Sequence, residues 1–289
     1  MVNTAAPETQ AHHSEPGESE YVLHRRFDRM ARLVGDANMQ KLMRTHVMVI
    51  GLGGVGSFAA ESLARSGIGE LTLVDFDEIC ITNTNRQLHA LQGLVGRKKA
   101  EVMAERCRKI NPQARVNALP LFYNSENSET ILSFKPDFIV DAIDNLTAKC
   151  HLIATLKQRG MRFITCAGSA AKMDPLAIRV SDLGATKVDP MASQVRKILR
   201  QKYEFPEGRE FGVPCVYSEE EPIWPHDLKY DKGQGFKCVC PQGQNNLHSC
   251  DNRNLIHGSA SFVTGAFGLA AAAWVVSQVT GPISRGPRS

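Results

Sequence analysis

The feature that most constrains this chain is a glycine-rich turn between a predicted strand and a predicted helix. The stretch HVMVIGLGGVGSFAAESLARSG, residues 46–67, reads as a buried strand, then Gly51, Gly53, Gly54 and Gly56, then a helix. Gly51 permits a tight turn, Gly53 lets the backbone approach a phosphate, and Gly56 allows the helix to pack closely. Free N–H groups at the start of that helix then face the anion. The stretch therefore predicts a nucleotide-binding turn rather than a turn used only for packing.

Strand and helix patterns alternate through the first half of the chain. The predicted strands are 46–51, 70–75, 115–119, 137–144 and 162–168, and the predicted helices between them are 56–67, 96–110, 125–134 and 146–160. Such alternation is typical of a parallel sheet with helices on both faces. The fold class predicted is α/β: a Rossmann-like, mainly parallel, doubly wound sheet.

After about Pro175 the rhythm changes and predicts a C-terminal extension of strands and a helix. This extension comprises strands 176–183 and 214–220, a basic helix 190–203 and a loop 219–235. Residues 1–20 lack apolar periodicity and are expected to form a disordered tail. We therefore expect one domain over residues 21–289, with a nucleotide-binding half of about 21–170 and a second half of about 171–280.

Composition adds only mild constraints. The formal net charge of +4 permits a nucleic-acid partner but does not demand one. The eight cysteines show no paired spacing typical of a disulfide framework, and no signal peptide pattern precedes them. A reducing, cytoplasmic environment is therefore expected.

One long uncharged segment, residues 258–281, could be mistaken for a membrane span. It is rich in small residues, including Gly258, Ser261, Gly265 and Gly268, so it is less apolar than a typical span. Small residues let backbones approach closely. We expect a buried or dimer-interface helix and no membrane association.

Polar residues that follow the glycine turn indicate which nucleotide is bound. Asp75 ends the second predicted strand nineteen residues after Gly56, where an acid would bind ribose hydroxyls, but this position suits NAD and ATP equally. The loop beyond it gathers donors and positive charge that a nicotinamide pocket does not need. These groups suit a triphosphate under nucleophilic attack. They are Asn83, Arg86, Gln87 and Lys99.

The fourth predicted strand ends in DAIDN, which places Asp141 and Asp144 at the carboxyl edge of the sheet. One of these carboxylates could hold Mg²⁺ between phosphates. Each residue has a plainer explanation when taken alone: Arg86 or Lys99 as a solvated charge, and Asp144 as the cap of the following helix. Together, beside a phosphate turn, they favour a catalytic site.

Five motifs in their order and spacing resemble those of the ubiquitin-activating-type superfamily, which adenylates carboxylates and includes the sulfur-carrier adenylyltransferases. The motifs are GLGGVGS, LTLVDFD, TNTNRQ, VGRKKAEV and DAIDN. The resemblance implies ATP bound at the glycine turn, ribose contact by Asp75, and phosphate contacts by Asn83, Arg86 and Lys99. It also implies Mg²⁺ at Asp144, and catalytic roles for Arg86, Lys99 and Asp144.

The same resemblance implies a homodimer in which an arginine ahead of the first strand reaches the partner's nucleotide. In the stretch RRFDRMARLVG the counterpart is Arg29. Within the superfamily, CITNTNRQLHAL, KAEVMAERCRKINP, VDAID, KMDP, KVDP and CVYSEE are similar to the branch of tRNA threonylcarbamoyladenosine dehydratases, also called cyclases. This similarity runs from about Leu23 to Val279.

The branch implies a reaction and its partners. A threonine carboxylate on modified tRNA attacks the α-phosphate of ATP, and the carbamoyl group then closes a ring and expels AMP, with net loss of water. A cysteine desulfurase system is a further partner implied by the resemblance. For tRNA, the candidate residues lie on and beside the basic helix, where they could equally form a solvated face. They are Lys187, Arg196, Lys197 and Arg200.

The sequence leaves open the roles of the three cysteines nearest the C-terminus. Cys238, Cys240, His248 and Cys250 could hold zinc, but a Cys-x-Cys spacing is unlike the usual Cys-x-x-Cys pairs, so structural zinc is not expected. Cys250 lies near a cysteine position of the dehydratase branch and could trap an acyl group transiently, or be merely a buried or exposed thiol.

Three rival functions remain. A sulfur-carrier adenylating enzyme is disfavoured by the missing zinc pairs, and a non-catalytic nucleotide-fold binding protein by the joint presence of Asp75, Arg86, Lys99 and Asp144. An NAD-dependent dehydrogenase is disfavoured by the polar loop alone.

Overall fold

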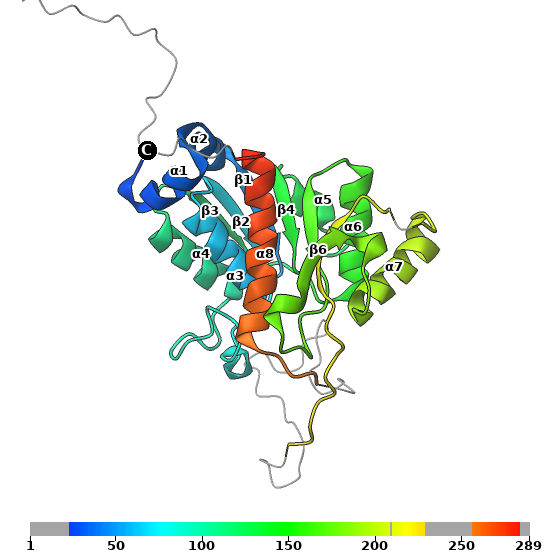
Figure 1. Ribbon diagram of the computed structural model, residues 1–289. Coiled ribbons are helices and arrows are strands. Elements are labelled where there is room, and N and C mark those ends of the chain that lie inside the picture. Colours follow the sequence, from blue (N-terminus) through cyan, green and yellow to red (C-terminus); the bar gives the residue numbers. More distant parts are fainter. Residues whose placement is uncertain (1–22, 209, 229–255, 284–289) are drawn as a thin grey trace, which may run out of the picture.

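The computed structural model describes residues 23–208, 210–228 and 256–283. Its centre is a seven-stranded sheet with the strand order β3-β2-β1-β4-β5-β7-β6 (Figure 1). The predicted tail, residues 1–20, lies outside the described residues. The strands are β1 (His46–Ile50), β2 (Glu70–Val74), β3 (Arg115–Leu119), β4 (Phe138–Asp141), β5 (Phe163–Cys166), β6 (Ile178–Asp182) and β7 (Pro214–Ser218).

The described helices alternate with the strands in the first half of the chain. They are α1 (Asp28–Val34), α2 (Asp36–Arg44), α3 (Gly56–Arg65), α4 (Lys99–Ile110), α5 (Ser128–Leu132), α6 (Leu146–Gln158), α7 (Pro190–Tyr203) and α8 (Ser261–Thr280). Short 3-10 turns occur at Arg25–Phe27, Ile81–Asn83, Pro175–Ala177 and Leu183–Ala185.

The order of the strands creates a switch point at the centre of the sheet. The chain builds β1, β2 and β3 outward in one direction, then returns to place β4 on the other side of β1. All these pairings are parallel, as are those of β4 with β5 and β5 with β7, whereas β6 pairs antiparallel to β7. In open α/β sheets, ligands bind at the carboxyl ends of the strands beside such a switch point.

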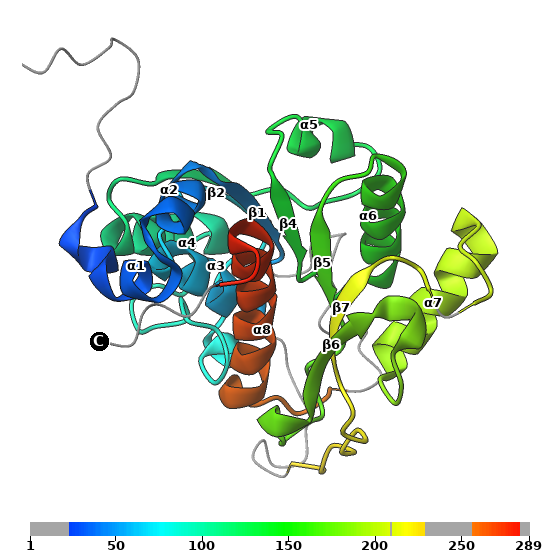
Figure 2. The same ribbon diagram turned by 45° about the horizontal axis from the view of Figure 1, so that its top comes forward.

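Each face of the sheet carries its own hydrophobic core. Side chains alternate along β1, so that Val47 and Val49 face the core under α1–α4 and α8, while Met48 and Ile50 face the core under α5, α6 and α7. Figure 2 shows the two groups of helices on opposite sides of the sheet. Burial on both faces explains why the central strands β1, β4 and β5 are mostly apolar.

Helix α8 accounts for the long apolar segment near the end of the sequence. By length and composition it could cross a membrane, and it is the one such helix within the part of the chain described. In the fold it packs along α3, and Gly268 lies so close that a Cβ there would be 2.3 Å from the Val55 carbonyl oxygen. Val263 and Phe267 are buried, whereas Phe262 and Leu269 are half exposed. The prediction of a buried helix is confirmed, and its dimer role stays a prediction.

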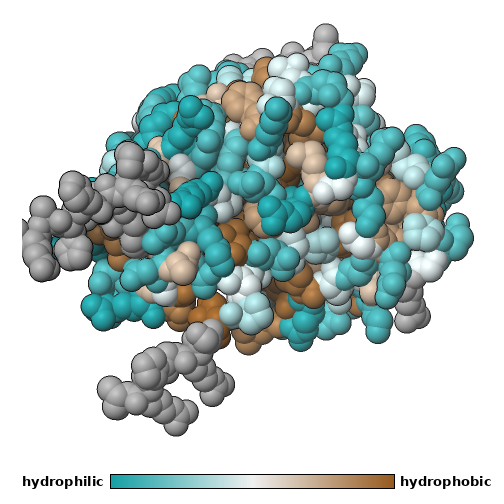
Figure 3. All heavy atoms as spheres, turned by 90° about the horizontal axis from the view of Figure 1, so that it is seen from above, coloured by the Kyte–Doolittle hydropathy of each residue, from teal (hydrophilic) through white to brown (hydrophobic). Residues whose placement is uncertain are grey.

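The α/β, mainly parallel, doubly wound prediction is confirmed, including the extension formed by β6, α7 and β7. Helices α1 and α2 were not predicted, because Gly35, with φ +81°, interrupts the pattern between them. Seen from above in Figure 3, the surface is mostly hydrophilic with apolar residues scattered among polar ones. The boundary between the two predicted halves remains a prediction.

Candidate functional site

A pocket of about 740 Å³ opens where β1, β2, β4 and β5 end. Its wall is completed by the loop that follows β2 and by the segment that leads into α8. The pocket therefore lies at the switch point that the strand order creates. Its lining includes all the residues that the sequence placed at the nucleotide except Gly56 and Arg29: Gly51, Gly53, Gly54, Asp75, Asn83, Arg86, Lys99 and Asp144.

The glycine turn has the steric requirements that its spacing predicted. Gly51 has φ +88°, and a Cβ there would lie 2.6 Å from the Ala142 carbonyl oxygen. A Cβ at Gly56 would lie 1.8 Å from the Gly51 carbonyl oxygen, so α3 can begin this close to β1 only with glycine. At Gly53, by contrast, the nearest atom would be 3.8 Å away, which leaves the backbone open to a ligand. The turn and packing roles are confirmed, and the phosphate contact stays a prediction.

Asp75 is buried and organises the turn from the end of β2. Its carboxylate accepts hydrogen bonds from the backbone N–H groups of Leu52, at 2.6 Å, and Asp77, at 2.9 Å. Burial raises the pKa of Asp75, and the nearby Lys99 ammonium acts in the opposite direction. Asp75 therefore fixes the glycine turn from within the pocket wall, and its predicted ribose contact remains untested.

Lys99 is the first residue of α4 and is buried at the pocket wall. Its Nζ lies 2.8 Å from Asp77 Oδ2, an interaction that sequence reasoning missed although Asp77 stands in the quoted VDFD motif. Burial alone would lower the pKa of Lys99, but Asp75, Asp77 and Asp144 outweigh it, and the net pKa is raised. Lys99 is thus held as a cation inside an acidic pocket wall.

The polar loop after β2 brings three further predicted residues to the pocket. Asn83 accepts a hydrogen bond from Cys80 N–H at 3.0 Å, which fixes the loop's 3-10 turn. The Arg86 guanidinium donates to the Thr82 carbonyl at 2.9 Å and lines the pocket. Gln87 is buried there, and its Oε1 has no hydrogen-bond partner among the described residues. These are donors and an acceptor suited to a polar ligand.

The two aspartates at the end of β4 have different surroundings. Asp141 is fully buried, lies 2.7 Å from Lys149 Nζ, and accepts from the Thr165 hydroxyl at 2.6 Å. Asp144 is exposed and lines the pocket, and the cap of α6 is Asn145, which accepts from the Ala148 N–H. Asp141 is therefore engaged in an internal ion pair, and Asp144 remains the candidate metal ligand.

Arg29 lies exposed on α1 and does not line the pocket of its own chain. Among the four tRNA candidates, Arg196 donates to the Thr186 hydroxyl and Arg200 to the carbonyls of residues 206–208. Lys187 and Lys197 are exposed. Two of the four candidates are thus held by internal contacts, and their predicted contact with tRNA is untested.

Neither the possible zinc site nor the possible acyl-trapping cysteine falls within the described residues. The side chains concerned are Cys238, Cys240, His248 and Cys250. Within the described ranges no group of three potential metal ligands occurs. The pocket does contain Cys166, and burial raises the pKa of its thiol to about 12. This thiol is therefore protonated near neutral pH and is a poor nucleophile.

His89 supplies a prediction of pH-dependent stability. Its ring is buried, neither ring nitrogen has a partner among the described residues, and burial lowers its pKa to about 3. Above pH 6.5 both the folded and unfolded states are neutral at this residue. As the pH falls below 6.5, the unfolded state gains a proton that the folded state does not, so the free energy of unfolding should drop by about 2 kcal/mol by pH 5.

The measurement is chemical denaturation of wild type and His89→Leu between pH 7.5 and pH 5. Other groups titrate in both proteins, so the difference between the two curves isolates His89. We expect the wild-type curve to fall more steeply. Parallel curves would show that His89 takes up a proton in the folded state.

Comparisons with known proteins identify the family of this chain. The model of the ThiF family matches residues 27–287. The tRNA threonylcarbamoyladenosine dehydratase of Haemophilus influenzae is 39% identical, over 88% of this chain and 93% of that protein. The dehydratase of Bacillus subtilis is 42% identical, over 70% of this chain and 77% of that protein.

The fold agrees as well. The crystal structure of the Escherichia coli tRNA N6-threonylcarbamoyladenosine dehydratase in complex with ATP matches with a TM-score of 0.75 and 36% identity, covering 88% of this chain and 93% of that one. The chain therefore belongs to the ThiF family and is a homologue of its tRNA threonylcarbamoyladenosine dehydratases.

Proposed function

We propose that this protein is an ATP-dependent tRNA threonylcarbamoyladenosine dehydratase that works through an acyl-adenylate. One observation carries the proposal: the switch-point pocket brings the glycine turn, Lys99, Arg86 and Asp144 together in a chain that matches such dehydratases over most of its length. An NAD-dependent dehydrogenase needs an apolar nicotinamide pocket, whereas this wall is cationic and acidic.

In the first step the threonine carboxylate of the modified nucleoside attacks the α-phosphate of ATP, and pyrophosphate leaves. Negative charge builds on the α-phosphate oxygens and on the leaving group. Lys99 and Arg86 line the pocket as fixed donors for that charge, and Gly53 leaves its backbone accessible. Donors of this kind, held in place before the reaction, stabilise a transition state because they need no reorganisation.

Mg²⁺ would neutralise charge on the phosphates when bound. Asp144 fits a magnesium ligand, because its carboxylate faces the pocket and makes no hydrogen bond or ion pair within the described parts of the chain. Mg²⁺ commonly takes one or two carboxylates together with phosphates and water, so a single aspartate is enough. Lys99, buried and held by Asp77, remains a separate cation.

In the second step the carbamoyl group of the same nucleoside attacks the activated carboxyl, a ring closes, and AMP leaves. The nucleophile and the electrophile belong to one molecule, so the step gains the rate advantage of an intramolecular reaction. A protein thiol is not required for this step, and the raised pKa of Cys166 agrees with that.

The assembly is part of the proposal. Arg29 is exposed on α1 and away from its own pocket, which suits a role at the nucleotide of a partner in a homodimer. Modified tRNA would approach over α7 and the residues before it, where Lys197 and Lys187 respectively are exposed. A cysteine desulfurase partner and a cytoplasmic location follow from the family resemblance and the cysteine usage.

The test is to incubate the protein with ATP, Mg²⁺ and tRNA that carries threonylcarbamoyladenosine, and to analyse the nucleosides by mass spectrometry. We expect a product lighter by one water, formed only when ATP is present. Unchanged nucleoside together with pyrophosphate exchange triggered by a sulfur-carrier protein would instead assign the carrier-adenylating function. If neither activity appears, the chain is a non-catalytic nucleotide-fold protein.

A further inference from the structure

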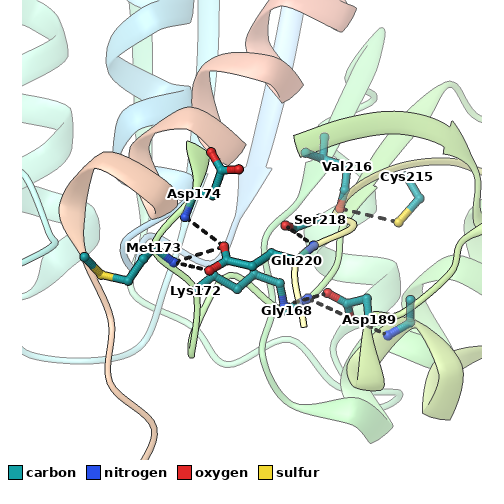
Figure 4. Close-up of polar contacts among 10 residues, drawn as sticks. Gly168, Lys172, Met173, Asp174, Asp189, Cys215, Val216, Ser218 and Glu220 are labelled. Carbon is teal, nitrogen blue, oxygen red and sulfur yellow. Dashed lines mark hydrogen bonds and ion pairs between the residues drawn. The ribbon is translucent and has the colours of Figure 1, made fainter. Parts of the chain in front are cut away.

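A second buried ion pair lies beside the stretch of pocket wall that follows β5. Lys172 Nζ is 3.3 Å from Asp189 Oδ2, and the two side chains are 1% and 0% exposed. Lys172 follows β5, and Asp189 is the N-cap of α7, so the pair joins two segments that are distant in sequence. Figure 4 shows Lys172 reaching toward Asp189 beside Gly168. The reaction steps described above do not use this pair.

The pair holds a stretch of the pocket wall. Asp189 Oδ1 accepts hydrogen bonds from the N–H groups of Ala192, at 2.9 Å, and Gly168, at 3.4 Å. The segment Gly168–Ala170 lines the pocket, together with Met191 from α7. The lysine therefore neutralises a buried carboxylate whose other oxygen positions this wall.

The same wall is tied to two further segments. The N–H of Ala171 donates to the Gly258 carbonyl at 2.8 Å, and the N–H of Ile223 donates to the Ala171 carbonyl at 2.8 Å. Beyond Lys172, the Glu220 carboxylate accepts from the N–H groups of Met173 and Asp174 (Figure 4). Three separate parts of the chain, at Asp189, residues 220–223 and Gly258, thus converge on residues 168–174.

Backbone strain marks both partners of the pair. Ala171, immediately before Lys172, has φ +59°, and Val188, immediately before Asp189, has φ +64°. A β-branched residue such as valine is a genuine outlier in this left-handed region. Such conformations persist only where the surroundings over-determine them, and they cluster at functional sites. The buried pair, with the hydrogen bonds around it, supplies that restraint.

The position of this wall along the sheet indicates what it faces. In the proposed function, Asp75 at the end of β2 and the glycine turn at the end of β1 mark the adenosine and phosphate side of the pocket that they line. β5 lies two strands beyond β1, on the other side of β4, about 10 Å away at the usual strand spacing. A group bound at Gly168–Ala170 would therefore lie past the phosphates, where an attacking carboxylate must enter.

We propose that Gly168–Ala170 and Met191 form the acceptor subsite, which takes the threonylcarbamoyl group of the modified nucleoside, and that Lys172 and Asp189 are positioning residues for it. The inference rests on the proposed function and deepens it. Small side chains at 168–170 leave room for an amino-acid-sized group, and the Ser169 hydroxyl and backbone groups can orient a carboxylate or carbamoyl. The pair holds this surface rather than contacting ATP.

The test uses the double variant Lys172→Met/Asp189→Asn in the full-length protein. It removes both charges together, keeps side chains of similar size, and keeps an N-cap residue on α7, so folding should be preserved. We expect the Kd for ATP, measured by calorimetry, to change less than twofold. The KM for modified tRNA should rise at least tenfold in the dehydration assay.

Two further variants separate positioning from simple stability. Ala170→Leu fills the same wall without touching the ion pair and should also raise the KM for tRNA while sparing the Kd for ATP. Glu61→Gln weakens an ion pair with Arg65 and Arg106 between α3 and α4, away from the pocket lining, and should leave both constants unchanged. Lys172→Arg should restore most of the activity lost in Lys172→Met.

The outcomes are distinguishable. If the wild type leaves the modified nucleoside intact, the proposed function is wrong, and the acceptor-subsite assignment is wrong as well. If the wild type is active but the double variant and Ala170→Leu keep its KM for tRNA, the acceptor subsite alone is wrong. If the double variant fails to fold, unchanged kinetics in Ala170→Leu would still overturn the assignment.

Discussion

Replacing Lys99 with alanine should lower turnover by about 10²- to 10³-fold, the effect of removing one preorganised donor to a developing oxyanion. Lys99 is buried, it lines the pocket, and its raised pKa keeps it charged beside Asp75 and Asp77. Its ammonium therefore stays charged near neutral pH and can interact with phosphate oxygens. Arg86→Ala should have a comparable effect, because Arg86 lines the same pocket from the loop after β2.

The loss of stability should be smaller than the loss of activity. Lys99 has an ion pair with a partly exposed Asp77, so its removal should cost about 1–2 kcal/mol of unfolding free energy. The matched control is Lys98→Ala. Lys98 is the preceding residue, pairs with Glu78 at 3.2 Å and does not line the pocket, so turnover should stay near wild type.

The measurements are kcat for dehydration and the free energy of unfolding from chemical denaturation. Near-normal turnover in Lys99→Ala or Arg86→Ala would show that the substituted residue has no catalytic role. A loss of activity that merely follows the unfolded fraction would assign a structural role instead.

Asn substitutions at Asp141 and Asp144 should have opposite consequences although the two residues are only three positions apart. Asp144→Asn is expected to lower turnover at least 100-fold with little change in stability, because Asp144 is an exposed pocket residue. Asp141→Asn leaves Lys149 buried without its counter-ion. It should therefore lower the free energy of unfolding by about 3–5 kcal/mol.

The experiment compares kcat at saturating and limiting Mg²⁺ with chemical denaturation of both variants. For Asp144→Asn, the Mg²⁺ concentration needed for half-maximal rate should rise. For Asp141→Asn, the fraction that remains folded should retain the wild-type Mg²⁺ dependence. An Asp144→Asn variant with an unchanged Mg²⁺ requirement would assign the metal to another ligand.

Local sequence patterns were enough to predict the fold and the glycine turn that forms one side of the pocket. The glycine spacing between Gly51 and Gly56 predicted a close approach of α3 to β1, because the steric demand arises within a few residues of chain. The alternation of strands and helices predicted the parallel sheet for the same reason: periodicity records which faces are buried. Helices α1 and α2 were not predicted because Gly35, which has a positive φ, breaks the pattern between them.

The residue pattern placed Asp141 and Asp144 together at a strand end and left both open as metal ligands, and only the family resemblance pointed to Asp144. That difference depends on Lys149 and Thr165, which reach Asp141 from α6 and β5. Asp77 beside Lys99 was missed for a similar reason, since 22 residues separate the two partners.

By itself, then, the sequence determined the α/β fold, the tight glycine turn between β1 and α3, and the family, because these depend on neighbours along the chain. Only the tertiary structure decided which carboxylates are neutralised inside the protein and which face the pocket. It alone brought Lys172 to Asp189 across 17 residues, beside two strained positions. The physical reason is that burial and pairing of charge are set by groups that fold together from distant elements, and no local pattern encodes them.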